Sequence, residues 1–62
     1  MNRRQFIKHL TNHNCYLLRH GASHDIYQNN SNQNISSVPR HNALNRNTCQ
    51  IICKQLEIPS PV

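Results

Sequence analysis

One histidine of this chain has a sequence context that suits proton-transfer chemistry. His24 follows a glycine and two small residues, Gly21, Ala22 and Ser23, and the chain then becomes apolar and β-prone. Glycine permits backbone angles that other residues avoid, so this segment is typical of a tight turn. The pattern predicts a turn that places a single imidazole at the start of a strand, where a group that titrates near neutral pH can accept or donate a proton.

Other interpretations of the same residues give different roles. His24 can instead be a partly buried histidine that hydrogen-bonds to a strand end. Ser23 and His24 do not form a hydrolase dyad, because adjacent strand residues point to opposite faces and no oxyanion motif accompanies them. Asp25 and Glu57 are the only acidic side chains, which excludes paired carboxylate catalysts and argues against a magnesium nuclease. We therefore expect no metal and no other cofactor.

The composition favours a polyanionic partner. The chain has 62 residues, with seven lysines and arginines against two acidic residues, and a formal net charge of +5. This charge most simply indicates nucleic acid. An anionic membrane surface is the competing interpretation, but it requires a basic amphipathic helix with a broad apolar face. No apolar run approaches the roughly 20 residues that span a bilayer, and no signal peptide is recognisable, so we expect a cytoplasmic protein without membrane contact.

The three cysteines fit a reducing compartment, because an odd number suits a disulfide framework poorly. Cys49 and Cys53 are four residues apart and would share one face of a helix. With a histidine they can form a partial metal site, although no Cys-x-x-Cys pair accompanies them. We favour the interpretation that they are small, partly buried core residues.

Capping residues and hydrophobic spacing predict the order helix, three strands, helix. The first helix is expected to open at Asn2, which caps its first turn, and to end at residues 11–14, where Asn14 suits a left-handed conformation. The strands are expected at residues 15–19, 24–28 and 35–38. Pro39 ends the third strand, and asparagines in the polar loop 29–34 suit a hairpin because they accept positive φ.

The second helix is expected to open at Asn47 and to end by Ile58, because Pro59 forbids continuation. Its predicted apolar face consists of Thr48, Ile52 and Leu56, widened by Cys49 and Ile51. Short connections make the strands an antiparallel meander, and both helices must cover one face of the sheet. The sequence therefore predicts an α+β fold, a two-layer α-β-β-β-α sandwich forming one domain over residues 1–62, with a proline-containing tail at 59–62.

Alternation along the second strand decides where His24 points. His24 and Ile26 share one face, whereas Asp25 and Tyr27 share the other. If His24 lies in the open, Tyr27 is a core residue and Ile26 is partly exposed, and the reverse arrangement buries His24. Asp25 is not expected to orient His24, because the two side chains diverge.

Three parts of the chain carry a family resemblance: the opening helix with Phe6, Ile7 and Leu10, the turn Gly21-Ala22-Ser23-His24, and Ser37-Val38-Pro39-Arg40-His41 followed by Ile52-Cys53-Lys54-Gln55-Leu56. In their order and spacing they resemble the HicA family of bacterial toxins, the mRNA interferases of HicA–HicB toxin–antitoxin pairs. The resemblance extends from Arg3 to Pro59.

This resemblance implies a fold like the double-stranded-RNA-binding domain, ribonuclease activity on mRNA, and neutralisation by a HicB-type antitoxin that covers the site. It also implies that the histidine of the Gly-x-x-His turn is essential, a role that falls on His24. The chain departs from the family in three places. Glu57 stands where relatives tend to have glycine after the last helix, Asn47 stands near a position that is often glycine, and the loop 29–34 lacks the basic residues of some relatives.

RNA carries its own nucleophile, the 2′-hydroxyl, so a metal-free ribonuclease needs proton-transfer groups and positive charge near the phosphate. Our hypothesis is that His24 is the general base or general acid. Arg40 can bind phosphate and His41 can be a second proton-transfer group, unless both belong to a solvated basic connector. The remaining candidates are Arg19 and Lys54, for RNA binding by charge alone, and Gly21 and Ser23, which form the turn.

The leading hypothesis is a metal-independent endoribonuclease toxin. One alternative is a small, non-catalytic module that binds double-stranded RNA, and another is an inactive toxin remnant that only binds its antitoxin. A histidine on a glycine-containing turn favours the enzyme, because a binding module would be expected to carry lysines there.

Overall fold

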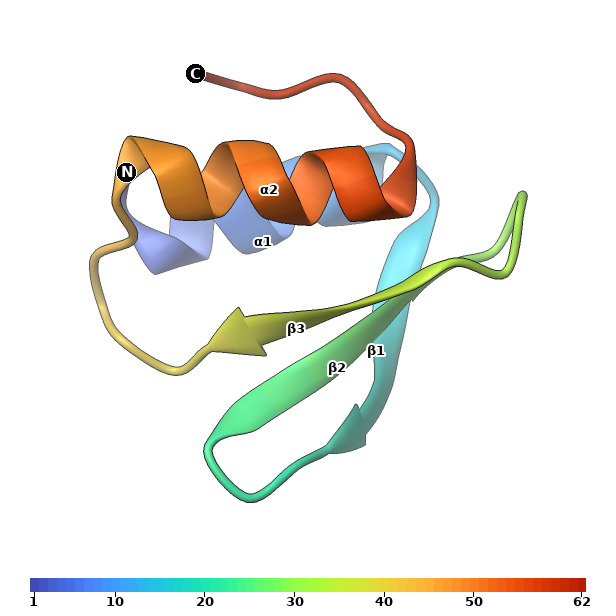
Figure 1. The fold of residues 1–62 in the computed structure, drawn as a ribbon, viewed down its shortest axis with the longest axis horizontal. Helices are drawn as coiled ribbons and strands as arrows, with labels where there is room; N and C mark the ends of the chain where they lie inside the picture. The colour runs from blue at the N-terminus through green and yellow to red at the C-terminus, as the bar shows by residue number, and fades with distance from the viewer.

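Two helices lie on one face of a three-stranded antiparallel sheet in the computed structural model, which describes residues 1–62 (Figure 1). The elements are α1 (Arg3–Asn12), β1 (Cys15–His20), β2 (His24–Asn29), β3 (Ile35–Pro39) and α2 (Arg46–Leu56). The strands follow one another in the sheet in the order β1-β2-β3. The predicted α+β architecture, element order and meander are confirmed.

The first helix begins and ends as predicted. Asn2 is its N-cap, and Oδ1 of Asn2 accepts a hydrogen bond from the Gln5 amide at 3.3 Å. After the helix, Asn14 adopts the left-handed conformation with φ of 68°. Phe6 and Leu10 are fully buried, which places the apolar side of α1 against the sheet.

The second helix begins two residues earlier than predicted. Its N-cap is Asn45, whose Oδ1 accepts from the Thr48 amide at 2.8 Å, and Asn47 lies inside the first turn. Leu44 is buried and exchanges two hydrogen bonds with Met1: its amide donates to the Met1 carbonyl at 2.7 Å, and its carbonyl accepts from the terminal amine at 2.6 Å. This contact fixes the chain directly before Asn45, and local sequence spacing does not reveal it.

The second helix ends at Leu56, before the proline requires it. Glu57 follows in the left-handed conformation, with φ of 57° and ψ of 48°. The Glu57 amide donates to the Lys54 carbonyl at 3.1 Å. The Ile58 amide donates to the Cys53 carbonyl at 3.0 Å, which completes a Schellman-type ending. A glutamate thus occupies the position that most often holds glycine.

Replacing Glu57 with glycine should raise the free energy of unfolding by about 0.5–1 kcal/mol. The left-handed conformation costs a non-glycine residue roughly 1–2 kcal/mol. Glycine avoids this cost, but its larger loss of entropy on folding offsets roughly 0.5–1 kcal/mol of the gain. Chemical denaturation measures the difference. Glu57→Ala is the matched control, because it removes the carboxylate that accepts from Asn34 and leaves the backbone strain. A glycine variant no more stable than the alanine variant would contradict this explanation.

The buried face of α2 differs from the predicted one. Its buried residues are Cys49, Ile52, Cys53 and Leu56, a stripe at spacings of three and four. Ile51 was expected on this face but is 56% exposed, because it lies about 100° around the helix from Ile52. Cys53 takes part instead. The two cysteines are core residues, as favoured, and burial raises the pKa of the Cys53 thiol to about 11.

The asparagine-rich loop between β2 and β3 closes the end of α2. Side-chain amides of Asn29 and Asn32 both donate to the Leu56 carbonyl, at 2.8 and 3.2 Å. The positive φ in this loop falls on Gln33, at 66°, and on none of its asparagines. The asparagines therefore serve through their side-chain hydrogen bonds, not through the positive φ that was expected of them.

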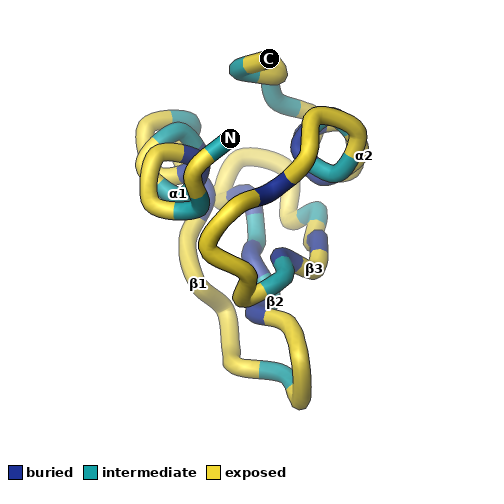
Figure 2. Tube along the Cα trace, turned by 90° about the vertical axis from the view of Figure 1, so that its left-hand side faces the viewer, coloured by how far each residue is buried: buried dark blue, intermediate teal, exposed yellow.

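The core lies between the helices and the sheet, and the other face of the sheet is uncovered (Figure 2). In β2 the buried and more exposed positions alternate, whereas in β1 only Cys15 is buried. The neighbouring edge residues Tyr16, Leu17 and Leu18 are each about two-fifths exposed. Neither helix has the length and apolar character that crossing a membrane requires.

Candidate active site

The turn before His24 is a two-residue hairpin loop. The Gly21 amide donates to the His24 carbonyl at 2.8 Å, so Ala22 and Ser23 form the loop between the paired residues. Gly21 does not have a positive φ, and the expectation that it provides unusual backbone angles is wrong. Its role is steric, because a Cβ at this position would lie 2.6 Å from the His24 carbonyl oxygen.

His24 begins β2 and points to the uncovered face of the sheet. Of the two arrangements that alternation allows, the structure has the one with His24 in the open: His24 is exposed and Ile26 is half-buried, whereas Asp25 and Tyr27 are each only 7% exposed. The alternative of a partly buried histidine bonded to a strand end is therefore wrong. An exposed imidazole at the end of a hairpin is accessible to a large substrate such as a polynucleotide.

Beside His24 there is a shallow depression of about 310 Å³. The remaining residues that line it come from β3 and α2: Ser37, Pro39, Thr48, Ile51, Ile52 and Gln55. His24 and Pro39 are paired across the sheet, which brings β3 to this place. The α2 residues were not predicted to lie near His24, because no local pattern indicates that α2 packs along β3.

Asp25, the residue after His24, is the centre of a charged cluster on the helix-facing side of the sheet. Its Oδ2 lies 2.8 Å from Arg3 Nη2. Its Oδ1 lies 2.8 Å from both His20 Nδ1 and Arg40 Nε. The cluster joins α1, the end of β1 and the end of β3 through one carboxylate. The sequence did not predict this cluster, although strand alternation set Asp25 on the face opposite to His24.

The cluster changes the titration of Asp25. Hydrogen bonds from His20 and then Arg40 lower the Asp25 pKa from its ordinary 3.8 to about 2. A carboxyl group whose pKa is lower in the folded protein contributes stability above its unfolded pKa, and this contribution is lost as the pH falls toward the folded value.

We accordingly expect the free energy of unfolding to fall between about pH 4 and pH 2, the window set by the Asp25 pKa values. The Asp25→Asn variant should lose this part of the pH dependence. Denaturant titrations of both proteins across that range measure the effect. Glu57→Gln removes the only other acidic side chain; it is the matched control and should retain the slope below pH 4. Parallel slopes for the parent protein and Asp25→Asn would contradict the assignment.

None of the other predicted RNA-binding residues lines the depression. Arg40 follows β3, and its guanidinium bonds to Asp25 and to the turn before His24. Arg19 is exposed on β1 and pairs with Ile26, so it shares the uncovered face with His24. His41 and Lys54 are exposed, in the loop after β3 and in the last turn of α2, and neither lines the depression.

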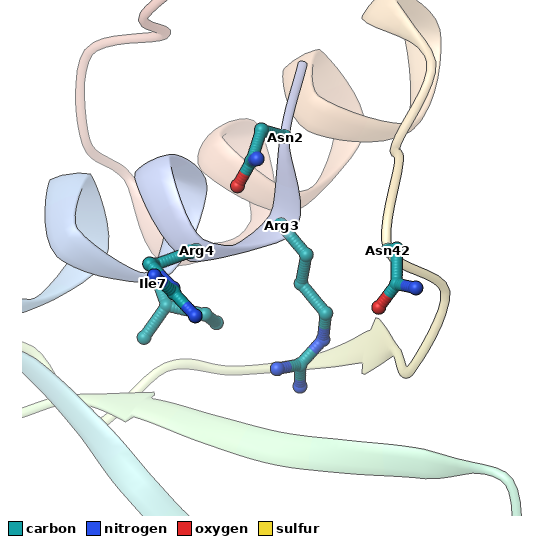
Figure 3. Close-up of a pocket in the computed structure, with 5 residues that line it drawn as sticks. All are labelled: Asn2, Arg3, Arg4, Ile7 and Asn42. Carbon is teal, nitrogen blue, oxygen red and sulfur yellow. The ribbon is translucent and has the colours of Figure 1, made fainter.

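A larger hollow of about 660 Å³ lies elsewhere, at the beginning of α1 (Figure 3). Its lining residues are Asn2, Arg3, Arg4, Ile7 and Asn42. Figure 3 shows the Arg3 side chain reaching from α1 toward the sheet, in agreement with its bond to Asp25. Because this hollow holds no histidine, carboxylate or thiol, we place the candidate site at His24.

Comparison with known proteins gives the biological class. A family model described as the HicA toxin of bacterial toxin–antitoxin matches residues 3–58. Searches of curated proteins and of solved structures found no match. The matched region contains both helices and all three strands, including the turn and His24. Because it covers nearly the whole chain, this protein belongs to the HicA family of toxins from bacterial toxin–antitoxin systems.

Proposed function

We propose that this toxin is a metal-independent endoribonuclease that cleaves mRNA and thereby blocks translation, with His24 as its proton-transfer catalyst. The observation that carries the proposal is the exposed imidazole at the start of β2, beside a shallow depression on a basic protein. Membership of the HicA family supports ribonuclease activity as the type of toxicity.

The chemistry requires little from a protein of this size. A general base removes the proton of the ribose 2′-hydroxyl, the resulting oxygen attacks the adjacent phosphorus, and the bond to the 5′-oxygen breaks as that oxygen is protonated. His24 performs one of the two proton transfers. The formal charge of +5 attracts the RNA backbone, and Arg19, His41 and Lys54 remain candidate RNA contacts. No step requires a metal ion.

We also propose that a HicB-type antitoxin neutralises the toxin by covering His24. Exposed apolar side chains at the site and on the same face of the sheet support such a contact. Ile51 lines the depression and is 56% exposed, and Ile35 is 52% exposed. Ile35 pairs with Gln28 and therefore shares the uncovered face with His24. Side chains of this kind are suited to the apolar centre of a protein–protein interface.

Incubation of the purified protein with single-stranded RNA in EDTA tests the proposed activity. We expect cleavage that survives the chelator, because no step of the proposed mechanism requires a metal ion. A gel shift without cleavage would instead support the alternative, a small RNA-binding module. The absence of both cleavage and a gel shift would support the inactive remnant. Cleavage that is abolished by EDTA would overturn the metal-free mechanism.

A further inference from the structure

Arg40 connects the end of β3 to the turn that precedes His24. Its guanidinium donates three hydrogen bonds: from Nε to Asp25 Oδ1 at 2.8 Å, from Nη1 to the Ala22 carbonyl at 3.2 Å, and from Nη2 to the Gly21 carbonyl. Two of these acceptors are backbone atoms of the two-residue hairpin loop and the residue before it. The Arg40 side chain is 41% exposed, so the contacts lie at the protein surface.

These contacts restrain a segment that has few others. Within the turn, the backbone bond from Gly21 to His24 closes the loop, and Ala22 and Ser23 are exposed. A guanidinium is planar and presents its donors in a fixed fork, so three bonds hold it in one orientation. Asp25 is itself bonded to Arg3 of α1, which ties the arrangement to the helix layer.

We propose that Arg40 is a positioning residue that fixes the turn and thereby the placement of the His24 imidazole. The proposal rests on the function proposed above for His24. It assigns to Arg40 a task other than the phosphate binding expected from its charge. Misplacement of a catalytic group by about 1 Å can cost about 100-fold in rate, so restraint of this turn has a measurable catalytic consequence.

The Arg40→Lys substitution distinguishes the positioning of the turn from the binding of phosphate. Lysine keeps the positive charge and can still attract a phosphate, but a single ammonium cannot reproduce the three directed bonds of the fork. We expect Arg40→Lys to lower kcat about 10-fold or more with KM changed less than about twofold. Arg40→Gln should have a kcat similar to that of Arg40→Lys. Arg4→Lys is the matched control, because Arg4 is exposed on α1, lines only the other hollow and makes no side-chain hydrogen bond within the protein, and its kcat should remain unchanged.

Hydrogen exchange of the Gly21 amide gives a second readout that needs no RNA. This amide donates the bond that closes the hairpin loop, and loss of the Arg40 bonds should speed its exchange about tenfold relative to the core amides. The comparison with core amides separates a local effect from a loss of global stability. If the wild-type protein does not cleave RNA, the proposed function fails, whereas the exchange result still decides whether Arg40 restrains the turn.

Three results would overturn the proposal. The first is an Arg40→Lys variant with wild-type kcat and wild-type Gly21 exchange. The second is faster Gly21 exchange with unchanged kcat, which would leave Arg40 a structural residue only. The third is a raised KM and a weaker salt dependence in Arg40→Gln but not in Arg40→Lys, which would indicate the phosphate contact.

Discussion

Replacing His24 with alanine should reduce RNA cleavage by at least about 100-fold, because a positioned general acid or base contributes roughly 10²–10⁴-fold to the rate. The fold should survive, since His24 is exposed and surface substitutions usually change stability by less than about 0.5 kcal/mol. Initial rates of cleavage of a single-stranded RNA oligonucleotide measure the first effect, and thermal unfolding measures the second. In bacteria, the variant should no longer arrest growth.

Ser37→Ala is the control for this experiment. Ser37 lines the same depression, is exposed, and belongs to the strand paired with β2, but its hydroxyl does not titrate near neutral pH. The control should therefore retain most of the activity. A folded His24→Ala variant that cleaves RNA at the wild-type rate would refute the role assigned to His24.

Replacing Ile52 with alanine should destabilise the protein by about 2–5 kcal/mol, the range found when a large aliphatic side chain is removed from a core. Ile52 is 3% exposed and belongs to the core between α2 and the sheet. At about 0.05–0.15 kcal/mol per residue, a 62-residue domain has about 3–9 kcal/mol of total stability. The variant should therefore lose about half of its stability, and its Tm should fall by at least about 8 °C, as circular dichroism would detect.

The adjacent Ile51 provides a control of identical chemistry. It has the same side chain on the same helix but is 56% exposed, so Ile51→Ala should change the free energy of unfolding by less than about 1 kcal/mol. Equal losses at the two positions would contradict the buried face assigned to α2. Because Ile51 lines the depression beside His24, the effect of Ile51→Ala on RNA cleavage can be measured in a protein that keeps its stability.

Local rules predicted the features of this fold that neighbouring residues decide. Asn2 capped α1 because its side chain can reach an amide three residues on, and Asn14 adopted the left-handed conformation that asparagine tolerates. Strand alternation predicted that Tyr27 and His24 lie on opposite faces, and the structure buries Tyr27 and exposes His24. The period alone did not decide which of the two faces is buried, because that depends on where the helices pack.

Contacts between distant segments decided the features that local rules missed. The start of α2 depends on Leu44 bonding to Met1, 43 residues away in the sequence. The bonds of Asp25 to Arg3 and Arg40 join residues 22 and 15 apart. Gly21 was recognised as special for the wrong reason, because its value lies in the close approach of the His24 carbonyl, a distance that the sequence does not contain.

A substrate with one altered ribose tests the central claim most directly. The cleavage position in an RNA oligonucleotide is mapped first. In a second oligonucleotide, the 2′-hydroxyl of the ribose directly 5′ of the cleaved phosphate is replaced by hydrogen. Both oligonucleotides are then incubated in EDTA with the wild-type protein and with the His24→Ala variant. We expect the wild-type protein to cut the all-ribose strand and leave the altered position intact, and the variant to cut neither. Cleavage at the altered position, or equal cleavage by the variant, would contradict a metal-free attack by the 2′-hydroxyl assisted by His24.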